Sequence, residues 1–360
     1  YAMNAPSSVP YVYMVAFKNS VETGVVNHFM TRFFPRLDIL RYQGRIHERL
    51  VTTDHSDIHT CRTYDIQILH HGYTQDMMDS REKGQRNIRL LTKCREDEPY
   101  SPYWAYHLGI TYKSIGDIKK AVDTFVIWRD LVDKKPDATM DYSIGYSAYI
   151  GCLLADKQIT RIITEAPKYD SKNHHNPDWN FNYAVALDQA GEVYKAYEVI
   201  TRNEKLRGTR IAVSSYDGDT VGWKLYAVKG TLLSKLGRLI EAKECWQSAY
   251  HLNPSDLSVL SSLISATVAA RDFVEAEKLI DTYMVLIGDS PISEVVARAH
   301  ADVLYNTGRI EDAIAIFQHF PNFDTILRNV EYNLLSNCRY NDLYRIHSVL
   351  KKAKKTNVKS

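Results

Sequence analysis

The sequence lacks the cysteine pattern of a disulfide-bonded or zinc-bound protein. Its five cysteines are scattered singly along the chain, and none belongs to a CxxC pair. Disulfide frameworks and structural zinc sites depend on cysteines grouped at short spacings. We therefore expect reduced cysteines that serve mainly as packing residues.

The sequence also lacks a large excess of charge of either sign. The 45 Lys and Arg residues nearly balance the 43 Asp and Glu residues, which leaves a formal net charge of +2. Proteins that bind nucleic acid need a basic surface to attract phosphates. We therefore expect no nucleic-acid partner.

Long apolar runs are absent as well. Although 45% of the residues are hydrophobic, no uninterrupted stretch approaches the roughly 20 residues that cross a bilayer. Residues 1–10 show neither the basic start nor the apolar core of a signal peptide. We expect a cytoplasmic protein without a membrane span, with a chain long enough to bury a sizeable core.

The common catalytic signatures are missing too. The sequence contains no nucleophile elbow, no P-loop and no Rossmann glycine pattern. This excludes several large enzyme classes and directs attention to the repeats and to the first ninety residues.

A recurring order of small and bulky residues occupies the C-terminal two thirds of the chain. Its clearest copy consists of Gly230, Gly237, Ala242, Trp246, Ala249 and Pro254. The residue 34 positions after Ala242 is again an alanine, Ala276, and further copies begin near Gly109, Ala184 and Ala301. This order and period are typical of the tetratricopeptide repeat, in which each copy is a pair of helices.

The residue types in the repeat have physical causes. Small residues such as Gly109 let two helices approach closely, and Gly116, Gly237 and Gly308 permit the left-handed backbone that ends a helix. One helix pair cannot bury its apolar face alone, so the pairs stack and leave a curved groove for a protein or peptide. We expect a right-handed stack of about six pairs over residues 103–350, with no strand beyond residue 100 and a solvated basic tail at 351–360.

Two segments interrupt the repeats. Residues 168–180 form a turn-rich linker in which His174-His175 is either a metal pair or, as we favour, plain surface histidines. Residues 207–220 contain Asp217-Gly218-Asp219, which resembles the start of a calcium loop but lacks the distal glutamate. We predict a simple turn there.

The first ninety residues follow another pattern. Short runs rich in Val, Ile, Tyr and Phe predict strands over residues 10–17, 25–34, 40–51 and 64–70. From residue 75 the pattern changes to an amphipathic helix that ends before Pro99. We predict a small domain over residues 1–92, a repeat domain over 93–350 and a basic tail over 351–360.

Four motifs in this first region carry a family resemblance. In order they are RFFPR at residues 32–36, GRIHE at 44–48, ILHHGYT at 68–74 and KGQRNIRLL at 83–91. Followed by tetratricopeptide repeats, they resemble the C-terminal part of bacterial family 2 glycosyltransferases of the GT-A fold. The resemblance implies a mainly α protein, in which a small α+β remnant of a GT-A-type glycosyltransferase domain precedes the α-solenoid.

The resemblance also implies roles for individual residues. Glu48 matches the carboxylate base that takes the proton of the acceptor hydroxyl, and His47 is the competing residue of the same motif. His70 matches a histidine near the metal and the diphosphate. Arg32 and Arg36 would face the diphosphate, since guanidinium groups bind paired oxygens well.

The same resemblance implies a cofactor that this chain does not complete. In the family, a nucleotide-binding half with a DxD metal motif precedes this region, and the sequence lacks that half. A divalent cation, Mn²⁺ or Mg²⁺, is therefore expected in the complete enzyme and none for this chain alone.

Structural alternatives stay open for two of these residues. Glu48 is alternatively an ion-pair partner of Arg45 or Arg49 on a strand, and His70 a satisfied histidine at a sheet edge.

Two classes of function follow from the sequence. One is sugar transfer from a nucleotide-sugar by a parent protein whose repeats bind a protein or peptide acceptor. The other is a non-catalytic tetratricopeptide-repeat scaffold for protein interactions, and oligomers are compatible with both.

Overall fold

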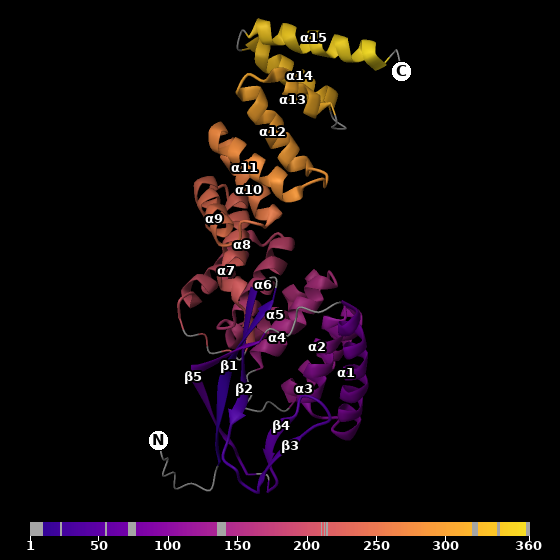
Figure 1. The fold of residues 1–360 in the computed structure, drawn as a ribbon, viewed down its shortest axis with the longest axis vertical. Coiled ribbons are helices and arrows are strands. Elements are labelled where there is room, and N and C mark those ends of the chain that lie inside the picture. Colours follow the sequence, from indigo (N-terminus) through magenta and orange to yellow (C-terminus); the bar gives the residue numbers. More distant parts are fainter. Residues whose placement is uncertain are drawn as a thin grey trace. The chain divides into compact units, whose positions relative to one another are not determined.

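The computed structural model describes residues 10–21, 24–54, 56–70, 77–134, 142–209, 211, 213, 215–318, 323–336 and 339–357. Within them the chain is mainly helical, with a small strand region at the N-terminal end (Figure 1). This confirms the predicted fold class at the level of a tetratricopeptide-like helical repeat that follows a few strands. The chain divides into two compact units, Tyr1–Leu236 and Gly237–Ser360, at a different place from the predicted domain limits.

The first unit begins with a sheet. Its strands are β1 (Tyr11–Val21), β2 (Gly24–Phe33), β5 (His59–His70) and β6 (Ser215–Asp217), in the order β5-β1-β2-β6. β1 and β2 form an antiparallel hairpin, and β5 runs parallel to β1 on its other side. Val12 and Val15 of β1 are fully buried, as expected for β-branched residues on the covered face of a sheet.

The predicted strand over residues 40–51 is wrong in one respect, because the run contains two strands. β3 (Leu40–Gln43) and β4 (Arg49–Thr52) pair antiparallel, and the GRIHE motif forms the turn between them. Gly44 has φ 123° and His47 has φ 51°. Positive φ values interrupt an extended strand and are typical of turns.

The predicted coupling helix is confirmed as α1 (Met77–Asp97). Leu91 and Cys94 on its covered face are buried against Trp104 and Leu108 of the next helix. α1 therefore links the strand region to the first repeat and packs against its first helix.

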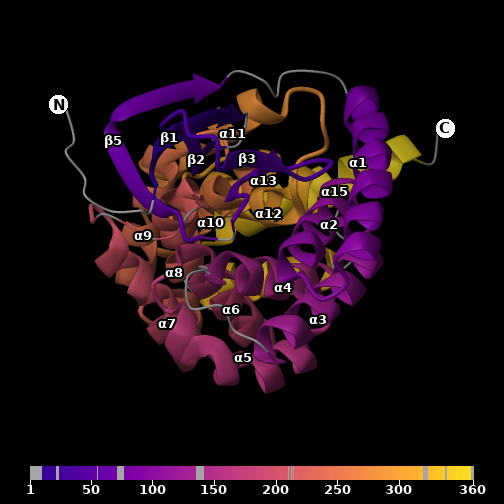
Figure 2. The same ribbon diagram turned by 90° about the horizontal axis from the view of Figure 1, so that it is seen from below.

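The helices that follow α1 in the first unit form three consecutive pairs, α2 to α7, and one further helix, α8. They are α2 (Pro102–Ser114), α3 (Ile118–Lys134), α4 (Ser143–Ala155), α5 (Ile159–Asn173), α6 (Pro177–Gln189), α7 (Val193–Leu206) and α8 (Trp223–Lys235). In Figure 2, α4 and α6 lie on the side of the sheet, whereas α3, α5 and α7 lie on the outside of the arc. The first helices of the pairs therefore form the inner face.

Glycines stand where the repeat pattern requires them. A methyl group on Gly109 of α2 would lie 2.9 Å from the Phe125 ring of α3, which explains the close approach within this pair. Gly116 has φ 81° at the turn between the two helices. Both predicted roles are confirmed.

The second unit continues the helical repeat. Its helices are α9 (Leu239–Leu252), α10 (Leu257–Ala269), α11 (Phe273–Ile287), α12 (Glu294–Asn306), α13 (Ile310–Phe317), α14 (Phe323–Ser336) and α15 (Tyr340–Asn357). Trp246 of α9 is buried, as predicted. From α2 to α15 the described residues hold seven pairs by order, one more than expected, and α15 includes most of the segment predicted to be a tail.

The second interruption of the repeats contains a strand. β6 pairs antiparallel with β2, and the 3₁₀ helix η1 (Gly218–Val221) follows it, capped by the Asp217 side chain, which accepts from the Asp219 N–H. The predictions of a simple turn and of no strand beyond residue 100 are therefore wrong. The sequence signal missed here is only three residues long.

The first interruption is shorter than predicted. α5 continues to Asn173, and α6 begins at Pro177 behind an Asn176 cap whose side-chain oxygen accepts from the N–H groups of Asp178 and Trp179. Asparagine is a preferred N-cap residue and proline is favoured in the first turn. Local capping therefore explains where this helix starts.

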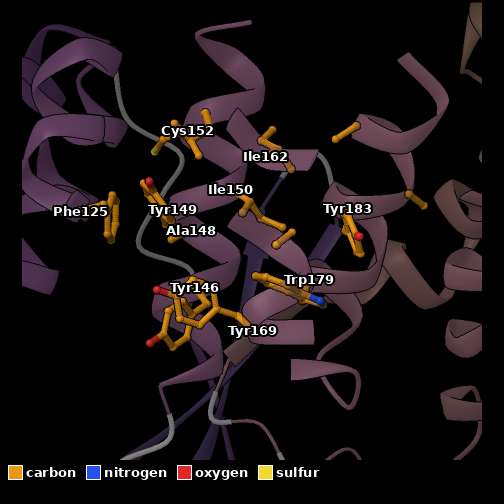
Figure 3. Close-up of a cluster of buried hydrophobic side chains, with 14 of the residues drawn as sticks. Phe125, Tyr146, Ala148, Tyr149, Ile150, Cys152, Ile162, Tyr169, Trp179 and Tyr183 are labelled. Carbon is orange, nitrogen blue, oxygen red and sulfur yellow. The ribbon is translucent and has the colours of Figure 1, made fainter. Parts of the chain in front are cut away.

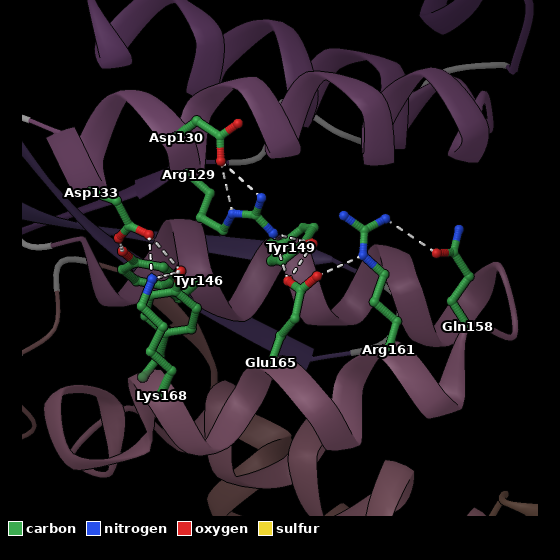
Figure 4. A network of polar contacts seen from close by, with 10 residues as sticks. Arg129, Asp130, Asp133, Tyr146, Tyr149, Gln158, Arg161, Glu165 and Lys168 are labelled. Carbon is green, nitrogen blue, oxygen red and sulfur yellow. Dashed lines mark hydrogen bonds and ion pairs between the residues drawn. The ribbon is translucent and has the colours of Figure 1, made fainter.

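An aromatic core fills the space between the helix pairs of the first unit. The rings of Tyr146 and Tyr169 stack with their centroids 4.4 Å apart, and Trp179 of α6 is fully buried. Figure 3 shows these three side chains in the same cluster. Polar groups reach the rim of this core (Figure 4). There the Glu165 carboxylate accepts from Tyr149 at 2.7 Å and from Arg129 at 2.6 Å, which satisfies the tyrosine hydroxyl.

Two glycines of α4 provide a matched test of this packing. A methyl group on Gly145 would overlap the Trp128 ring, whereas one on Gly151 would meet only the end of the Asn182 side chain at 3.2 Å. We expect Gly145→Ala to lower the free energy of unfolding by about 1 to 3 kcal/mol through overpacking. Gly151→Ala should change it by less than about 1 kcal/mol, since alanine favours the helix. Urea unfolding measures both, and equal effects would contradict the proposed packing.

Candidate functional site

A cavity of about 460 Å³ lies between the N-terminal strands and the first helix pairs. We call it the sheet pocket. Its lining residues are Val12, Met14, Met30, Thr31, Arg32, Tyr42, Glu48, Leu50, Ile58, Thr60, Tyr103, Tyr106, His107, Trp128, Tyr142 and Ile144. The volume is in the range of ligand pockets, and the lining combines aromatic and aliphatic side chains with few charges.

Two of the predicted site residues meet in the sheet pocket. Arg32 from the end of β2 and Glu48 from the turn between β3 and β4 both line it. His47 lies beside it, because its ring stacks on the pocket residue His107 with centroids 4.2 Å apart. The Tyr103 hydroxyl donates to the backbone oxygen of His47 at 2.7 Å and holds the turn against α2.

Of the other two predicted residues, one lies away from this pocket and the side chain of the other is outside the described structure. Arg36 is exposed in the segment between β2 and β3 and is not among the lining residues. His70 ends β5, but its side chain lies outside the described residues, as do the following residues of the ILHHGYT motif. The predicted role of His70 stays a prediction.

The two charged residues of the pocket differ in their surroundings. Arg32 donates to the Thr31 backbone oxygen at 3.0 Å and to the Met30 sulfur at 3.5 Å. Glu48 has no hydrogen bond or ion pair within the part of the chain that the structure describes. Of the two ion pairs expected as alternatives, Glu48 with Arg45 is not formed, because Arg45 binds the Asp97 carboxylate of α1 at 2.9 Å. The side chain of Arg49, the other expected partner, lies outside the described residues.

Burial disfavours the charged form of both stacked imidazoles, His107 in the pocket wall and His47 beside it. Burial lowers the pKa of His107 to about 3, and the neighbouring His47 acts in the same direction. Loss of water at its stacked ring lowers the pKa of His47, while the Glu48 carboxylate raises it. The low pKa of His107 keeps this residue of the pocket wall uncharged near neutral pH.

A second cavity, of about 400 Å³, lies on the inner face of the helices. We call it the inner pocket. Its lining residues are Tyr106, Ile110, Lys113, Ile144, Ser147, Ala148, Asp178, Phe181, Asn182, Asp217, Thr220 and Lys224. They come from α2, α4, α6, β6, η1 and α8, and Tyr106 and Ile144 also line the sheet pocket.

The floor of the inner pocket contains a carboxyl group that holds β6 and η1 in place. Asp178 accepts from the Asp217 N–H at 3.0 Å and from the Thr220 hydroxyl at 3.1 Å. Burial raises the pKa of Asp178 to about 6, and the Asp217 carboxylate acts in the same direction. Asp217 is itself paired with Lys224 at 2.5 Å.

Polar groups in the inner pocket were missed by the sequence analysis. The Asn182 amide donates to the Ser147 backbone oxygen at 3.2 Å, and the buried Ser147 hydroxyl has no hydrogen-bond partner among the described residues. Lys113 is exposed and forms no ion pair within the described ranges. The only signal for these residues is their place on the inner faces of α2, α4 and α6, which requires knowing the helix phase.

The structure supplies no metal site of its own in the described part of the chain. No group of three or more His, Cys, Asp or Glu residues there is arranged to hold a metal ion. His174 Nδ1 lies 2.8 Å from the Ser171 oxygen, and its ring stands nearly perpendicular to that of His175. The divalent cation predicted for a complete enzyme remains a prediction.

None of the helices described is long and apolar enough to cross a membrane.

Comparison with known proteins gives structural similarities only. No family model matches the chain, and no curated protein matches it. Among solved structures, YrrB, described as a TPR protein with an unusual peptide-binding site, is 12% identical, with 61% of this chain and 99% of YrrB covered and a TM-score of 0.44. PilF of Pseudomonas aeruginosa is 13% identical, with 70% and 99% covered and a TM-score of 0.48.

A third solved structure is similar in the same way. TTC0263, a thermophilic TPR protein of Thermus thermophilus, is 12% identical, with 57% of this chain and all of TTC0263 covered and a TM-score of 0.39. Sequence identities and TM-scores this low give no ground for assigning a function to this chain. The glycosyltransferase resemblance gains no support from these similarities.

The neutral state of His107 predicts a pH dependence of stability. An unfolded chain takes up a proton on this imidazole near its ordinary pKa of about 6.5, whereas the folded chain does so only near 3. Its contribution to stability is therefore complete above the ordinary pKa and is lost as the pH falls below it. We expect the difference in unfolding free energy between the wild type and His107→Gln to fall by about 1.4 kcal/mol per unit from pH 6 to 4.

Urea unfolding followed by circular dichroism at several pH values measures this difference. The difference in unfolding free energy between the two proteins at pH 7.5 does not enter the test, because only its change with pH reports the titration of His107. Parallel curves down to pH 4 would show that His107 is freely protonated in the folded chain.

Proposed function

We propose that this chain is a protein-interaction module whose repeats bind an extended peptide segment in the inner pocket. The observation that carries the proposal is that four inner helices in succession, α2, α4, α6 and α8, contribute to one polar cavity. An extended segment that crosses successive helices meets side chains from each of them. Stacked helix pairs offer such a surface to partners.

The chemistry of the inner pocket fits a peptide backbone. A peptide offers N–H donors and C=O acceptors along its length. The Ser147 hydroxyl is buried without a partner among the described residues, and such groups in native proteins usually find one. The Asn182 amide has a donor and an acceptor to offer, and Lys113 supplies a cation for a carboxylate or carbonyl group.

Selection of a phage-displayed random peptide library on the full chain tests this proposal. Selected peptides are expected to bind Asn182→Ala about fivefold more weakly, the typical effect of one lost hydrogen bond. Asn306→Ala is the matched control, since Asn306 of α12 is exposed and, among the described residues, bonds only to its own helix. Fluorescence anisotropy with labelled peptides gives the affinities, and melting temperatures verify folding. Peptides that bind both variants equally would place their site elsewhere.

A second candidate function is sugar transfer by a longer parent protein. The specific observation in its favour is that Arg32 and Glu48, which the motif resemblance assigns to diphosphate contact and to the base, line one cavity. A carboxylate without an ion pair is available to accept a proton from an acceptor hydroxyl. The divalent cation and the nucleotide-binding half would have to come from outside this sequence.

Calorimetry with uridine and guanosine diphosphate sugars in the presence of Mn²⁺ examines this candidate. We expect no micromolar binding by this chain, because the described residues include no cluster that could hold the Mn²⁺ which neutralises the diphosphate of the donor. Clear binding that is lost in Arg32→Ala and kept in Glu48→Gln would contradict this expectation and favour the catalytic interpretation. Binding that survives both changes would place the nucleotide outside the sheet pocket.

A further inference from the structure

The walls of the sheet pocket fit a bulky apolar side chain. The strands contribute Met14, Met30 and Leu50, and the helices contribute Tyr106 and Trp128. Met30 is 37% exposed, so part of this wall is open to solvent. Methionine and aromatic side chains favour contact with another aromatic or long aliphatic group.

The two charged residues of the sheet pocket, Arg32 and Glu48, differ in how far they are already bonded within the chain. Arg32 is engaged by the backbone oxygen of Thr31 and by the Met30 sulfur. Glu48 is exposed and is without a hydrogen bond or ion pair in the ranges that the structure describes. Glu48 is therefore the charged residue that a ligand can pair with, and its negative charge favours a basic group on the ligand.

The two cavities are neighbours. Tyr106 of α2 and Ile144 of α4 line both of them, so one pair of side chains forms their common wall. A peptide that lies in the inner pocket is therefore within reach of the sheet pocket. Alternate side chains of an extended chain point to opposite sides, which lets one residue enter a side cavity while its neighbours stay on the inner face.

We propose that the sheet pocket selects the peptide that the module binds, by taking up a bulky apolar side chain next to a basic residue that pairs with Glu48. This inference rests on the proposed peptide-binding function and adds the chemistry of the partner. The N-terminal strands then contribute to specificity and do not only cover the helices.

The experiment uses the peptides selected from the phage library and two variants of the sheet pocket. Thr60→Trp places a large side chain in the pocket from strand β5, where aromatic residues are well tolerated, and should weaken binding about tenfold or more. Glu48→Gln should weaken binding about threefold at low salt and less at high salt, as expected for an exposed ion pair. Glu96→Gln is the control, because Glu96 of α1 is exposed and lies outside both pockets.

The peptides supply the reciprocal test. Their consensus is expected to pair one bulky apolar residue with a basic neighbour, and replacing the basic residue by Gln should abolish the effect of Glu48→Gln. Peptides that respond to Asn182→Ala but not to Thr60→Trp would overturn this inference and leave the proposed function intact. If no selected peptide responds to either change, both are overturned. A dimer in analytical ultracentrifugation that Thr60→Trp dissociates would make a second copy of the chain the occupant and would also overturn the inference.

Discussion

The arrangement of the first unit depends on how the segment of β6 and η1 is fixed between a sheet and a helix array. On one side β6 pairs with β2. On the other side Asp178, at the start of α6, accepts from Asp217 and Thr220. The buried amide of Asn203 in α7 donates to the Thr220 oxygen at 2.8 Å. Buried polar groups are costly unless they are satisfied, so these bonds require one specific placement of the segment.

Both cavities follow from that placement. The strands lie on the inner side of α2 and α4 and leave the sheet pocket between them, and β6 and η1 form one end of the inner pocket. In a stack of helix pairs alone the inner face would be an open groove. Here part of that groove is occupied by the chain itself, and the two open cavities that remain differ in character, one largely apolar and one polar. The two cavities therefore present different side-chain chemistry to a ligand.

The sequence was informative wherever a structure is determined locally. The spacing of Gly109, Gly116 and Phe125 predicted the first helix pair, because close packing and a left-handed turn each require a particular residue type. The division of residues 40–51 was missed, because the prediction ran one strand through the mainly polar residues between Gln43 and Arg49, where the backbone turns with positive φ at Gly44 and His47. β6 was missed as well, because three residues carry no periodicity and their partner strand is distant in sequence.

The candidate site was also predictable in part, where its residues belong to short local motifs. Arg32 and Glu48 were singled out from short motifs, and the fold places both on one cavity. Their aromatic surroundings come from α2 and α4, which the sequence assigned to a separate domain. Asn182 and Ser147 carry no motif at all, and only the packing of α6 on α4 reveals that they share a pocket.

The pairing of β2 with β6 also bears on how the chain is made. A strand near the N-terminal end pairs with one that follows three complete helix pairs, so the sheet is finished only after nearly all of the first unit has left the ribosome. Contacts between residues so distant in sequence form slowly, because closing a long loop costs entropy before the contact is gained. Until then the free edge of β2 is open to pairing with other chains. The early helix pairs fold from local contacts, and the last strand covers that edge at Val26, Asn27 and His28.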